Sequence, residues 1–514
     1  MISFDSSALT IENIVDIALK KKTIALSQDT HFRQRIAKGS EFLERLLEED
    51  GTIYGVTTGY GDSCTVAIPP ELVNELPKHL YTFHGCGMGN MLSPTLTRAV
   101  LAARLTSLCQ GYSGVSETLL QQLERLLQHD ILPLIPEEGS VGASGDLTPL
   151  SYVAAVLCGE RSVYYQDEIQ ATADVFRKLN ITPISLRPKE GLAIMNGTAV
   201  MTGIACIAFD RARYLAKIAT RITAMATLVT KGNAHHFDDI LFQVKPHPGQ
   251  QEIARWLRQD LHVGEPPRNP NRLQDRYSLR CAPHVIGVIQ DTLPWLRQLI
   301  ENELNSANDN PIIDGEGEHV LHGGHFYGGH IALAMDTLKN TVANIADLLD
   351  RQMALMMDPK FNHGLPANLS GAQGSRATIN HGFKAVQIAT SAWSAEALKH
   401  TMPASVFSRS TECHNQDKVS MGTIAARDCQ RVLQLTEQVA SAALLACCQG
   451  IDLRIQQSEL AIDNLAPEVV HMLHSIRETS SFLEEDRALD HELHHTVNAI
   501  QQQQWALYES ANHA

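Results

Sequence analysis

The sequence predicts a mainly α-helical protein, in which a bundle of long helices carries a smaller N-terminal lobe. The 514 residues are 44% hydrophobic but only 5% aromatic, so Ala and Leu, which favour helix over sheet, supply much of the apolar content. In addition, several long segments repeat apolar residues every three or four positions, on more than one helix face. Helices of that kind are typical of a large buried bundle.

The long helical segments lie mostly in the C-terminal part of the chain. Predicted helices cover residues 198–231, 285–305, 330–357, 378–400, 421–448 and 490–508. A Pro-rich stretch at residues 243–274 interrupts them and predicts an extended surface loop. We therefore place the helix bundle at residues 201–514 and the smaller lobe at residues 1–200.

The smaller lobe combines short helices with glycine-rich loops. Helical spacing predicts helices at residues 11–20, 32–47, 93–109 and 148–157, and Ser93 and Pro94 fit the start of the third. A short strand is predicted at residues 163–165. Glycines in residues 51–70 and 139–145 predict loops, because glycine lets the backbone turn tightly. The first loop is a candidate lid.

Charge and composition exclude several classes of function. The net charge of −15 disfavours nucleic acid and anionic membranes as partners. No apolar run approaches the roughly 20 residues of a transmembrane helix, and the first residues lack the pattern of a secretion signal. The ten cysteines have no metal-type spacing. We expect a cytoplasmic protein with reduced thiols.

The segment GSVGASGD at residues 139–146 is the first candidate for chemistry. Its local pattern predicts a loop in which Ser144 or Asp146 caps the next helix. It fits neither a nucleophile elbow nor a dinucleotide loop. A third interpretation is self-processing: the Gly145 nitrogen attacks the Ala143 carbonyl, and two waters leave, one of them from Ser144. The product, methylidene-imidazolone (MIO), is a strong electrophile, and its formation needs small residues in a tight turn.

Further motifs lie before and after this tripeptide in a fixed order along the chain. Together they resemble the aromatic amino acid ammonia-lyases: the histidine, phenylalanine and tyrosine lyases and their aminomutase relatives. The matching motifs are YGVTTGYG (54–61), GSVGASGDLTPLSYVA (139–154), GLAIMNGT (191–198), QDRYSLRC (274–281), SANDNPII (306–313), GGHFY (323–327) and HNQDKVSMG (414–422). They span most of the chain. The resemblance implies a helical core of the fumarase/aspartase type.

The resemblance also implies a reaction, the elimination of ammonia from an aromatic L-amino acid to give a trans-arylacrylate. The β-proton is weakly acidic and the amine leaves poorly, so the reaction needs both an electrophile for the amine and a base. The implied cofactor is MIO formed from Ala143, Ser144 and Gly145, without a metal. The implied assembly is a homotetramer whose active sites use more than one subunit, and apolar helix faces agree with such burial.

The resemblance assigns roles to individual residues. Tyr54, in the candidate lid, matches the catalytic base, and a phenol in that role needs a pKa lowered by positive neighbours or helix N-termini. Tyr277 matches a second catalytic tyrosine, and Arg280 matches the bidentate clamp for the substrate carboxylate. The other matched substrate-binding residues are Phe83, His84, Asn196, Gln274, Phe326, Lys384 and Gln416.

Four of these residues bear on the substrate ring. The pair Phe83-His84 is a mixture: histidine lyases resemble Ser-His there, many tyrosine lyases His-Leu, and plant-type phenylalanine lyases Phe-Leu. Gln416 stands where histidine lyases carry a glutamate that pairs with imidazole, and Lys384 resembles the phenylalanine and tyrosine group. We predict L-tyrosine first and L-phenylalanine next, giving p-coumarate or cinnamate. Histidine ammonia-lyase activity giving urocanate, or an aromatic 2,3-aminomutase, are the alternatives.

Two residues depart from the family pattern and change the polarity expected of the pocket. His325 replaces the asparagine usual in Gly-Gly-Asn-Phe, and Tyr60 replaces a common phenylalanine in the lid.

Two alternatives lie outside the lyase interpretation. His491, Glu492 and His495 fit the H-E-x-x-H pattern of a zinc metallopeptidase, but with 23 histidines in the chain a chance match is the simpler explanation. A helical relative that has lost turnover is disfavoured, because the chain keeps the catalytic tyrosines, the serine and the arginine together.

Overall fold

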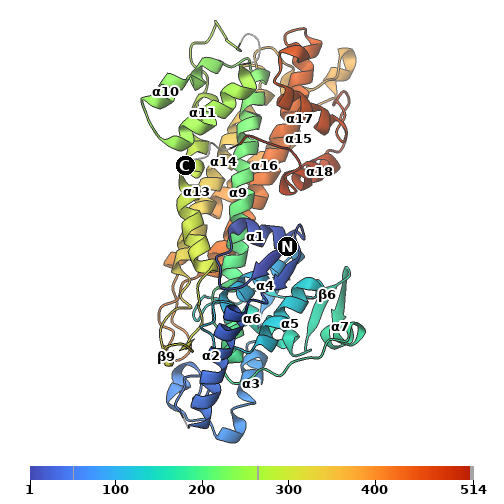
Figure 1. Cartoon of the computed structure of the whole chain (residues 1–514). Coiled ribbons are helices and arrows are strands. Elements are labelled where there is room, and N and C mark those ends of the chain that lie inside the picture. The colour runs from blue at the N-terminus through green and yellow to red at the C-terminus, as the bar shows by residue number, and fades with distance from the viewer. Residues whose placement is uncertain (50, 263–265, 510–514) are drawn as a thin grey trace. The chain divides into compact units, whose positions relative to one another are not determined.

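The computed structural model describes residues 1–49, 51–262 and 266–509, and it confirms a mainly α-helical fold (Figure 1). The described chain divides into two compact units. Unit 1 comprises Met1–Asp210, Arg297–Asp336 and Pro403–Arg427, and unit 2 comprises Arg211–Leu296, Thr337–Met402 and Asp428–Ala514. Each unit is therefore built from three separate segments of the chain. The predicted division into a lobe at residues 1–200 and a bundle at residues 201–514 stays a prediction.

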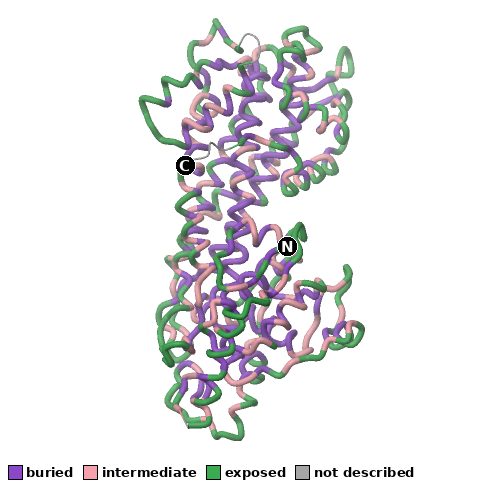
Figure 2. Tube along the Cα trace, viewed as in Figure 1, coloured by how far each residue is buried: buried purple, intermediate pink, exposed green. Residues whose placement is uncertain are grey.

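The longest helices confirm the predicted bundle. They are α9 (Ala199–Val229), α13 (Ala282–Leu304), α14 (Gly329–Met357) and α16 (Gly422–Gln456). In unit 2, Cys447 Sγ of α16 lies 3.7 Å from the Ile222 carbonyl oxygen of α9 and 3.7 Å from Met356 Sδ of α14, so these three helices pack together. Buried residues follow α9 and α16 over most of their length (Figure 2), as expected for helices that are apolar on several sides.

Unit 1 contains the shorter helices of the N-terminal segment together with all the strands of the described residues. The helices are α1 (Ile11–Ala18), α2 (Thr30–Glu48), α3 (Leu76–Phe83), α4 (Pro94–Leu108), α5 (Glu117–Gln128), α6 (Leu147–Leu157), α7 (Thr172–Leu179) and α8 (Glu190–Met195). Helix α4 starts as predicted, because the Ser93 side chain accepts a hydrogen bond from the Leu96 amide at 3.3 Å.

The strands form small sheets. They are β1 (Ile2–Phe4), β2 (Ile24–Leu26), β3 (Met88–Met91), β4 (Leu132–Pro133), β5 (Pro136–Glu138), β6 (Ser162–Tyr165), β7 (Glu168–Ala171), β8 (Ile312–Asp314) and β9 (His319–Leu321). Strands β1 and β2 pair in parallel, whereas β3 with β5, β4 with β6, β6 with β7, and β8 with β9 pair antiparallel. Strand β5 ends just before the GSVGASG loop, so this pairing anchors one end of the loop.

Unit 2 adds short helices around the long ones. These are α10 (Asp239–Gln243), α11 (Pro248–Leu261), α12 (Tyr277–Arg280), α15 (Lys384–Lys399), α17 (Pro467–Arg477) and α18 (Asp490–Gln501). The Pro-rich stretch 243–274 was predicted to be extended, and this is wrong for α11. Pro248 begins that helix, where its missing N–H and fixed φ are tolerated.

Other predicted helix boundaries also shift. The helix expected from residue 378 begins only at Lys384, because Gly374–Thr378 forms a 3₁₀ turn and Gly382 has φ +54. Helix α16 continues to Gln456 rather than ending at residue 448, and α18 ends at Gln501 rather than reaching residue 508. Helices α5 and α17 lie in segments for which no helix was predicted.

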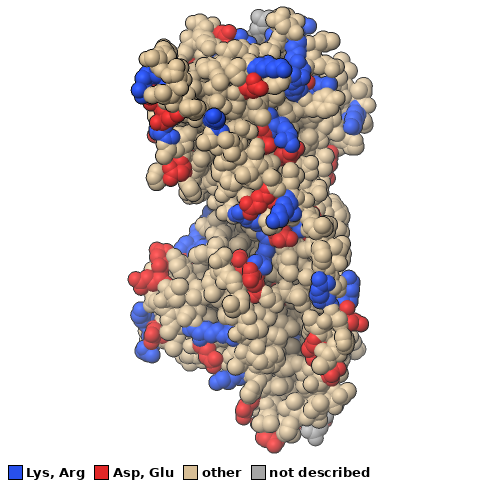
Figure 3. Space-filling view, turned by 180° about the vertical axis from the view of Figure 1, so that it is seen from behind, with Lys and Arg blue, Asp and Glu red and all other residues tan. Residues whose placement is uncertain are grey.

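The surface carries charges of both signs. On the face that Figure 3 shows, Lys and Arg side chains are interspersed with Asp and Glu rather than gathered into one large field. No helix among the described residues is both long and apolar enough to cross a membrane. Within the same residues, no cluster of three or more His, Cys, Asp or Glu side chains is arranged to hold a metal ion.

Candidate active site

The Ala143–Gly145 tripeptide lies in the loop between β5 and α6, and its last residue has no room for a side chain. Gly145 has φ +71, and a Cβ atom placed on it would lie 2.1 Å from the Gly197 carbonyl oxygen. Gly145 and Gly197 form a parallel bridge, and the Asp146 amide donates to that same Gly197 oxygen at 2.7 Å. Another residue at position 145 would therefore force the two backbones apart.

Asn196, the neighbour of Gly197, also contacts the tripeptide. Its side-chain amide nitrogen donates to the Ser144 carbonyl oxygen at 3.3 Å. The other side-chain atom, Asn196 Oδ1, is buried and has no hydrogen-bond partner among the described residues. A buried acceptor without a donor is unusual in a native protein.

A second segment, residues 411–421, also forms hydrogen bonds with the loop. The Ser420 amide donates to the Gly142 carbonyl oxygen at 3.3 Å, and the Met421 amide donates to the Val141 carbonyl oxygen at 3.0 Å. Gln416 Nε2 donates to Ser144 Oγ at 3.2 Å, while Gln416 Oε1 accepts from Thr411 Oγ1 at 2.8 Å. The tripeptide is thus clamped between segments that are far apart in the sequence.

Asp146 does not cap helix α6 through its side chain, although local sequence predicts that it or Ser144 would. It occupies the N-cap position, but its carboxylate instead accepts from Ser140 Oγ at 3.1 Å, from the Met201 amide at 3.0 Å and from Thr423 Oγ1. Burial raises the pKa of this carboxyl group, and the hydrogen bonds act against the shift. Asp146 therefore ties the loop to α9 and α16 residues of unit 1.

The predicted lid segment, residues 51–70, turns back on itself, so that Gly61 contacts Tyr54. The Tyr54 hydroxyl accepts a hydrogen bond from the Gly61 amide at 2.7 Å, and the Asp62 amide donates to the Glu412 carboxylate at 2.8 and 3.1 Å. We expected positive neighbours or helix N-termini to lower the pKa of Tyr54. Instead burial raises the pKa of Tyr54, Glu412 adds to the increase, and only the Gly61 N–H opposes it.

Phe83 and His84 lie at the end of α3. Their ring centroids are 4.6 Å apart, and the His84 carbonyl oxygen accepts from Ser151 Oγ of α6 at 3.2 Å. Burial lowers the pKa of His84 to about 4, so this imidazole is neutral at pH 7. Phe83 remains 58% exposed. Phe326 is half-buried in the loop before α14, next to the exposed His325.

Four of the predicted residues, Gln274, Tyr277, Arg280 and Lys384, belong to unit 2. Tyr277 begins helix α12 and is 71% exposed. The Arg280 guanidinium carbon lies 4.7 Å from the Tyr277 ring centroid, and Arg280 Nε donates to the Asp275 carbonyl oxygen at 3.0 Å. Gln274 is exposed beside them. Exposure of this group leaves its functional atoms available to a ligand or to another chain.

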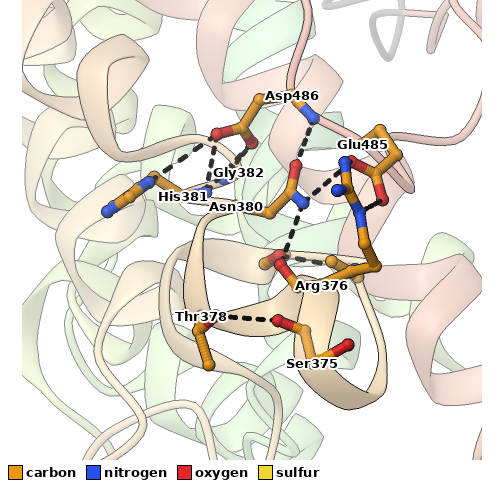
Figure 4. A network of polar contacts seen from close by, with 10 residues as sticks. Ser375, Arg376, Thr378, Asn380, His381, Gly382, Glu485 and Asp486 are labelled. Carbon is orange, nitrogen blue, oxygen red and sulfur yellow. Dashed lines mark hydrogen bonds and ion pairs between the residues drawn. The ribbon is translucent and has the colours of Figure 1, made fainter.

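Lys384 is the first residue of α15, and a polar network fixes the turn just before it (Figure 4). The Asp486 carboxylate accepts from the His381 and Gly382 amides, each at 2.8 Å. Asn380 joins the same network, because its Oδ1 accepts from the Asp486 amide at 2.6 Å. The network determines where the helix begins, while Lys384 itself stays exposed.

The structure therefore brings only part of the predicted set into direct contact. Ser144 forms hydrogen bonds with Asn196 and Gln416, all in unit 1. Among the described residues, no hydrogen bond joins Ser144 to Tyr54, His84 or Phe326, although these also belong to unit 1.

Motif analysis missed two residues of this region. Glu412 lies just before the HNQDKVSMG motif, and its proximity to that motif was the only available signal. Arg104 lies behind Asn196, and its signal is a single arginine within an otherwise apolar stretch of α4.

Known proteins resemble this chain in sequence and in structure. Histidine ammonia-lyase of Caenorhabditis elegans is 36% identical over 460 residues, which is 88% of this chain and 67% of that protein. Histidine ammonia-lyase of Bacillus velezensis is 33% identical over 497 residues, 96% of this chain and 94% of that protein. Tyrosine aminomutase of Streptomyces globisporus matches in structure with a TM-score of 0.90 and 32% identity, covering 98% of this chain and 97% of that one.

A family model described as aromatic amino acid lyase matches residues 9–478. That range covers most of the chain and contains every motif from Tyr54 to Gly422. The chain belongs to the aromatic amino acid lyase family, whose named members in these comparisons include ammonia-lyases, which cleave a carbon–nitrogen bond.

Proposed function

We propose that this protein is an MIO-dependent ammonia-lyase that converts an aromatic L-amino acid into a trans-arylacrylate. The observation that carries the proposal is the clamped tripeptide: the close approach of Gly145 to Gly197 leaves no room for a side chain, while Asn196 and Gln416 both form hydrogen bonds with Ser144. The MIO group derived from Ala143, Ser144 and Gly145 supplies an electrophile for the substrate amine. Asn196 Oδ1, buried without a partner among the described residues, supports an added group there.

In this proposal Tyr54 removes the β-proton. Its hydroxyl already accepts a hydrogen bond from the Gly61 amide at 2.7 Å, and that bond stabilises a phenolate. Burial and Glu412 oppose ionisation in this chain, so additional positive groups are needed around Tyr54 during the reaction. Arg280 and Lys384 of unit 2 are the cations that the resemblance places in the site, with Arg280 as the carboxylate clamp and Tyr277 as the second catalytic tyrosine.

We further propose a homotetramer in which different subunits supply these groups. Tyr277 is 71% exposed in its own chain. Apolar side chains on helices α13, α14 and α15 are also exposed, including Val288 at 50%, Leu333 at 46% and Ile388 at 61%. Exposed apolar surface of this kind favours contact with further copies of the chain. Light scattering of the purified protein, compared with the monomer mass of 56.5 kDa, tests the assembly.

Two kinds of substrate ring have support. The names of the relatives favour L-histidine, which was the alternative and not the first prediction. The side chains favour L-tyrosine or L-phenylalanine, because the Gln416 amide has no charge to pair with an imidazole and Phe83 offers an apolar contact. His84, neutral at pH 7, can bond either a phenol or an imidazole. The similarity to a tyrosine aminomutase adds a third outcome, a β-amino acid product.

The decisive experiment incubates purified protein with L-tyrosine, L-phenylalanine and L-histidine separately. Arylacrylate absorbance follows elimination, and chromatography detects a β-amino acid. Reaction with L-histidine alone rejects the tyrosine proposal, and reaction with L-tyrosine but not L-histidine rejects the histidine one. The Ser144→Ala protein is the control: it is expected to fold and to lose nearly all turnover, and full activity would reject the mechanism.

A further inference from the structure

Arg104 is a buried cation that no family role described above explains. It belongs to α4, and its exposed fraction is 0%. Nη2 donates to Asn308 Oδ1 at 3.0 Å and to Ser107 Oγ at 2.6 Å, and Nη1 donates to the Asn196 carbonyl oxygen at 3.4 Å. Nε has no hydrogen-bond partner, and no carboxylate forms an ion pair with this guanidinium among the described residues.

The charges around Arg104 explain how it is tolerated but not why it is present. Burial lowers its pKa, and the nearby carboxyl groups Asp309, Asp146 and Glu303 oppose that effect. Of these, Asp309 is already paired with the buried Lys189. A buried charge without a direct counter-ion is costly, and buried ionic groups can often be replaced by apolar residues without loss of stability. A role in positioning neighbouring groups is therefore a better explanation than stability.

The guanidinium lies directly behind the turn that faces the tripeptide. A Cβ atom on Gly197 would lie 2.0 Å from Arg104 Nη1 and 2.5 Å from Asn308 Oδ1. Asn308 Oδ1 also accepts from the Thr198 amide at 3.4 Å. Arg104 and Asn308 thus support the outer side of the 196–198 turn. Its inner side binds Ser144 through Asn196 and pairs with Gly145 through Gly197.

We propose that Arg104 is the positioning residue that holds the 196–198 turn against Ala143–Gly145, so that the tripeptide can close into its ring. This inference rests on the proposed function. Ring closure forms a bond from the Gly145 nitrogen to the Ala143 carbonyl carbon. The Ala143 oxygen leaves as water with hydrogens from the Gly145 and Ser144 nitrogens. Ser144 Oγ then leaves as a second water with the Ser144 Cα hydrogen, and no oxidant is needed.

The geometry explains why support from behind matters. Ring closure requires the Gly145 nitrogen to approach the Ala143 carbonyl carbon, although a peptide ordinarily keeps these atoms apart. If the 196–198 turn moves away from the tripeptide, the loop that carries Ala143–Gly145 is no longer held in the geometry that ring closure needs. A misplacement of about 1 Å slows a reaction between positioned groups by about a hundredfold. Only an arginine is long and forked enough to reach the Asn196 carbonyl and Asn308 together.

The test compares Arg104→Lys and Arg104→Gln with the full-length wild type by intact mass, circular dichroism and thermal unfolding. Ring formation is visible as the loss of two waters, independent of turnover. Arg98→Gln is the matched control, because Arg98 lies on the same helix but pairs with Asp130. We expect both Arg104 variants to keep wild-type circular dichroism and to lose the waters about a hundredfold more slowly, whereas Arg98→Gln dehydrates like the wild type.

Each other result has a definite meaning. Wild-type dehydration in both Arg104 variants overturns the inference and leaves the proposed function intact. An unmodified mass in active wild-type protein removes the proposed function itself. An Arg104→Lys protein that is unfolded by circular dichroism makes Arg104 a stability residue and also overturns the inference. If Arg98→Gln loses the waters as slowly as the Arg104 variants, the inference is also overturned, because the effect would then belong to α4 as a whole.

Discussion

Replacing Gly145 by alanine tests whether the clamped loop is required for ring formation. The new methyl group meets the Gly197 carbonyl oxygen at 2.1 Å, where ordinary contact is about 3.5 Å. The backbones must separate by about 1.4 Å, which breaks the 2.7 Å hydrogen bond from the Asp146 amide to that oxygen. An unsatisfied buried amide costs about 1–3 kcal/mol, and alanine at φ +71 adds about 1–2 kcal/mol.

The distortion is expected to stop self-processing. A loss of about 2–5 kcal/mol lowers the population of the closing geometry by about 30-fold or more, at 1.4 kcal/mol per factor of ten. The measurement is the intact mass of freshly purified Gly145→Ala protein, followed over days, with arylacrylate formation as a second readout. Thermal unfolding reports whether the rest of the fold survives.

Gly374→Ala separates backbone strain from the contact. Gly374 has φ +58 in the 3₁₀ turn before α15, and a Cβ atom there would meet nothing within 4 Å. The Gly374→Ala variant therefore has the same backbone strain of about 1–2 kcal/mol as Gly145→Ala, but its methyl group collides with nothing. We expect this variant to lose two waters and to turn over substrate normally. The reasoning fails if Gly145→Ala loses two waters as quickly as the wild type, or if Gly374→Ala is impaired to the same degree.

The remaining predictions concern the groups around the tripeptide. Tyr54→Phe should lose its two waters normally yet reduce kcat by about 10²–10⁴-fold, as expected for a lost base, and unchanged kcat would remove Tyr54 from that role. Gln416→Glu should raise the kcat/KM ratio of L-histidine to L-tyrosine by about tenfold or more, because a hydrogen bond to a charged group contributes about 1.5–3 kcal/mol; an unchanged ratio argues against the assigned position. The pKa of His84 is lowered from 6.5 to about 4, so between these values the unfolded chain binds more protons. Stability is therefore full above pH 6.5 and falls as the pH drops toward 4, and His84→Gln should show a smaller fall in unfolding temperature over that interval.

Much of the fold was predictable because it depends on local pattern. The apolar repeat of α9 and α16 is dense enough to indicate buried helices, and Ser93-Pro94 marks the start of α4. Boundaries were less predictable where local signals compete. The proline at 248 was interpreted as loop although it begins α11, and the end of α18 is not marked by any strong helix-breaking residue.

The sequence by itself determined the family, and it predicted the ring-forming tripeptide and the residues around it, because the order of the motifs along the chain carries that information. Only the tertiary structure decided which of these residues touch. The Gly145 pairing with Gly197, the Gln416 contact with Ser144 and the guanidinium of Arg104 behind the turn join segments far apart in sequence. Tertiary packing also decided protonation: burial, which no motif encodes, raises the pKa of Tyr54 and lowers that of His84.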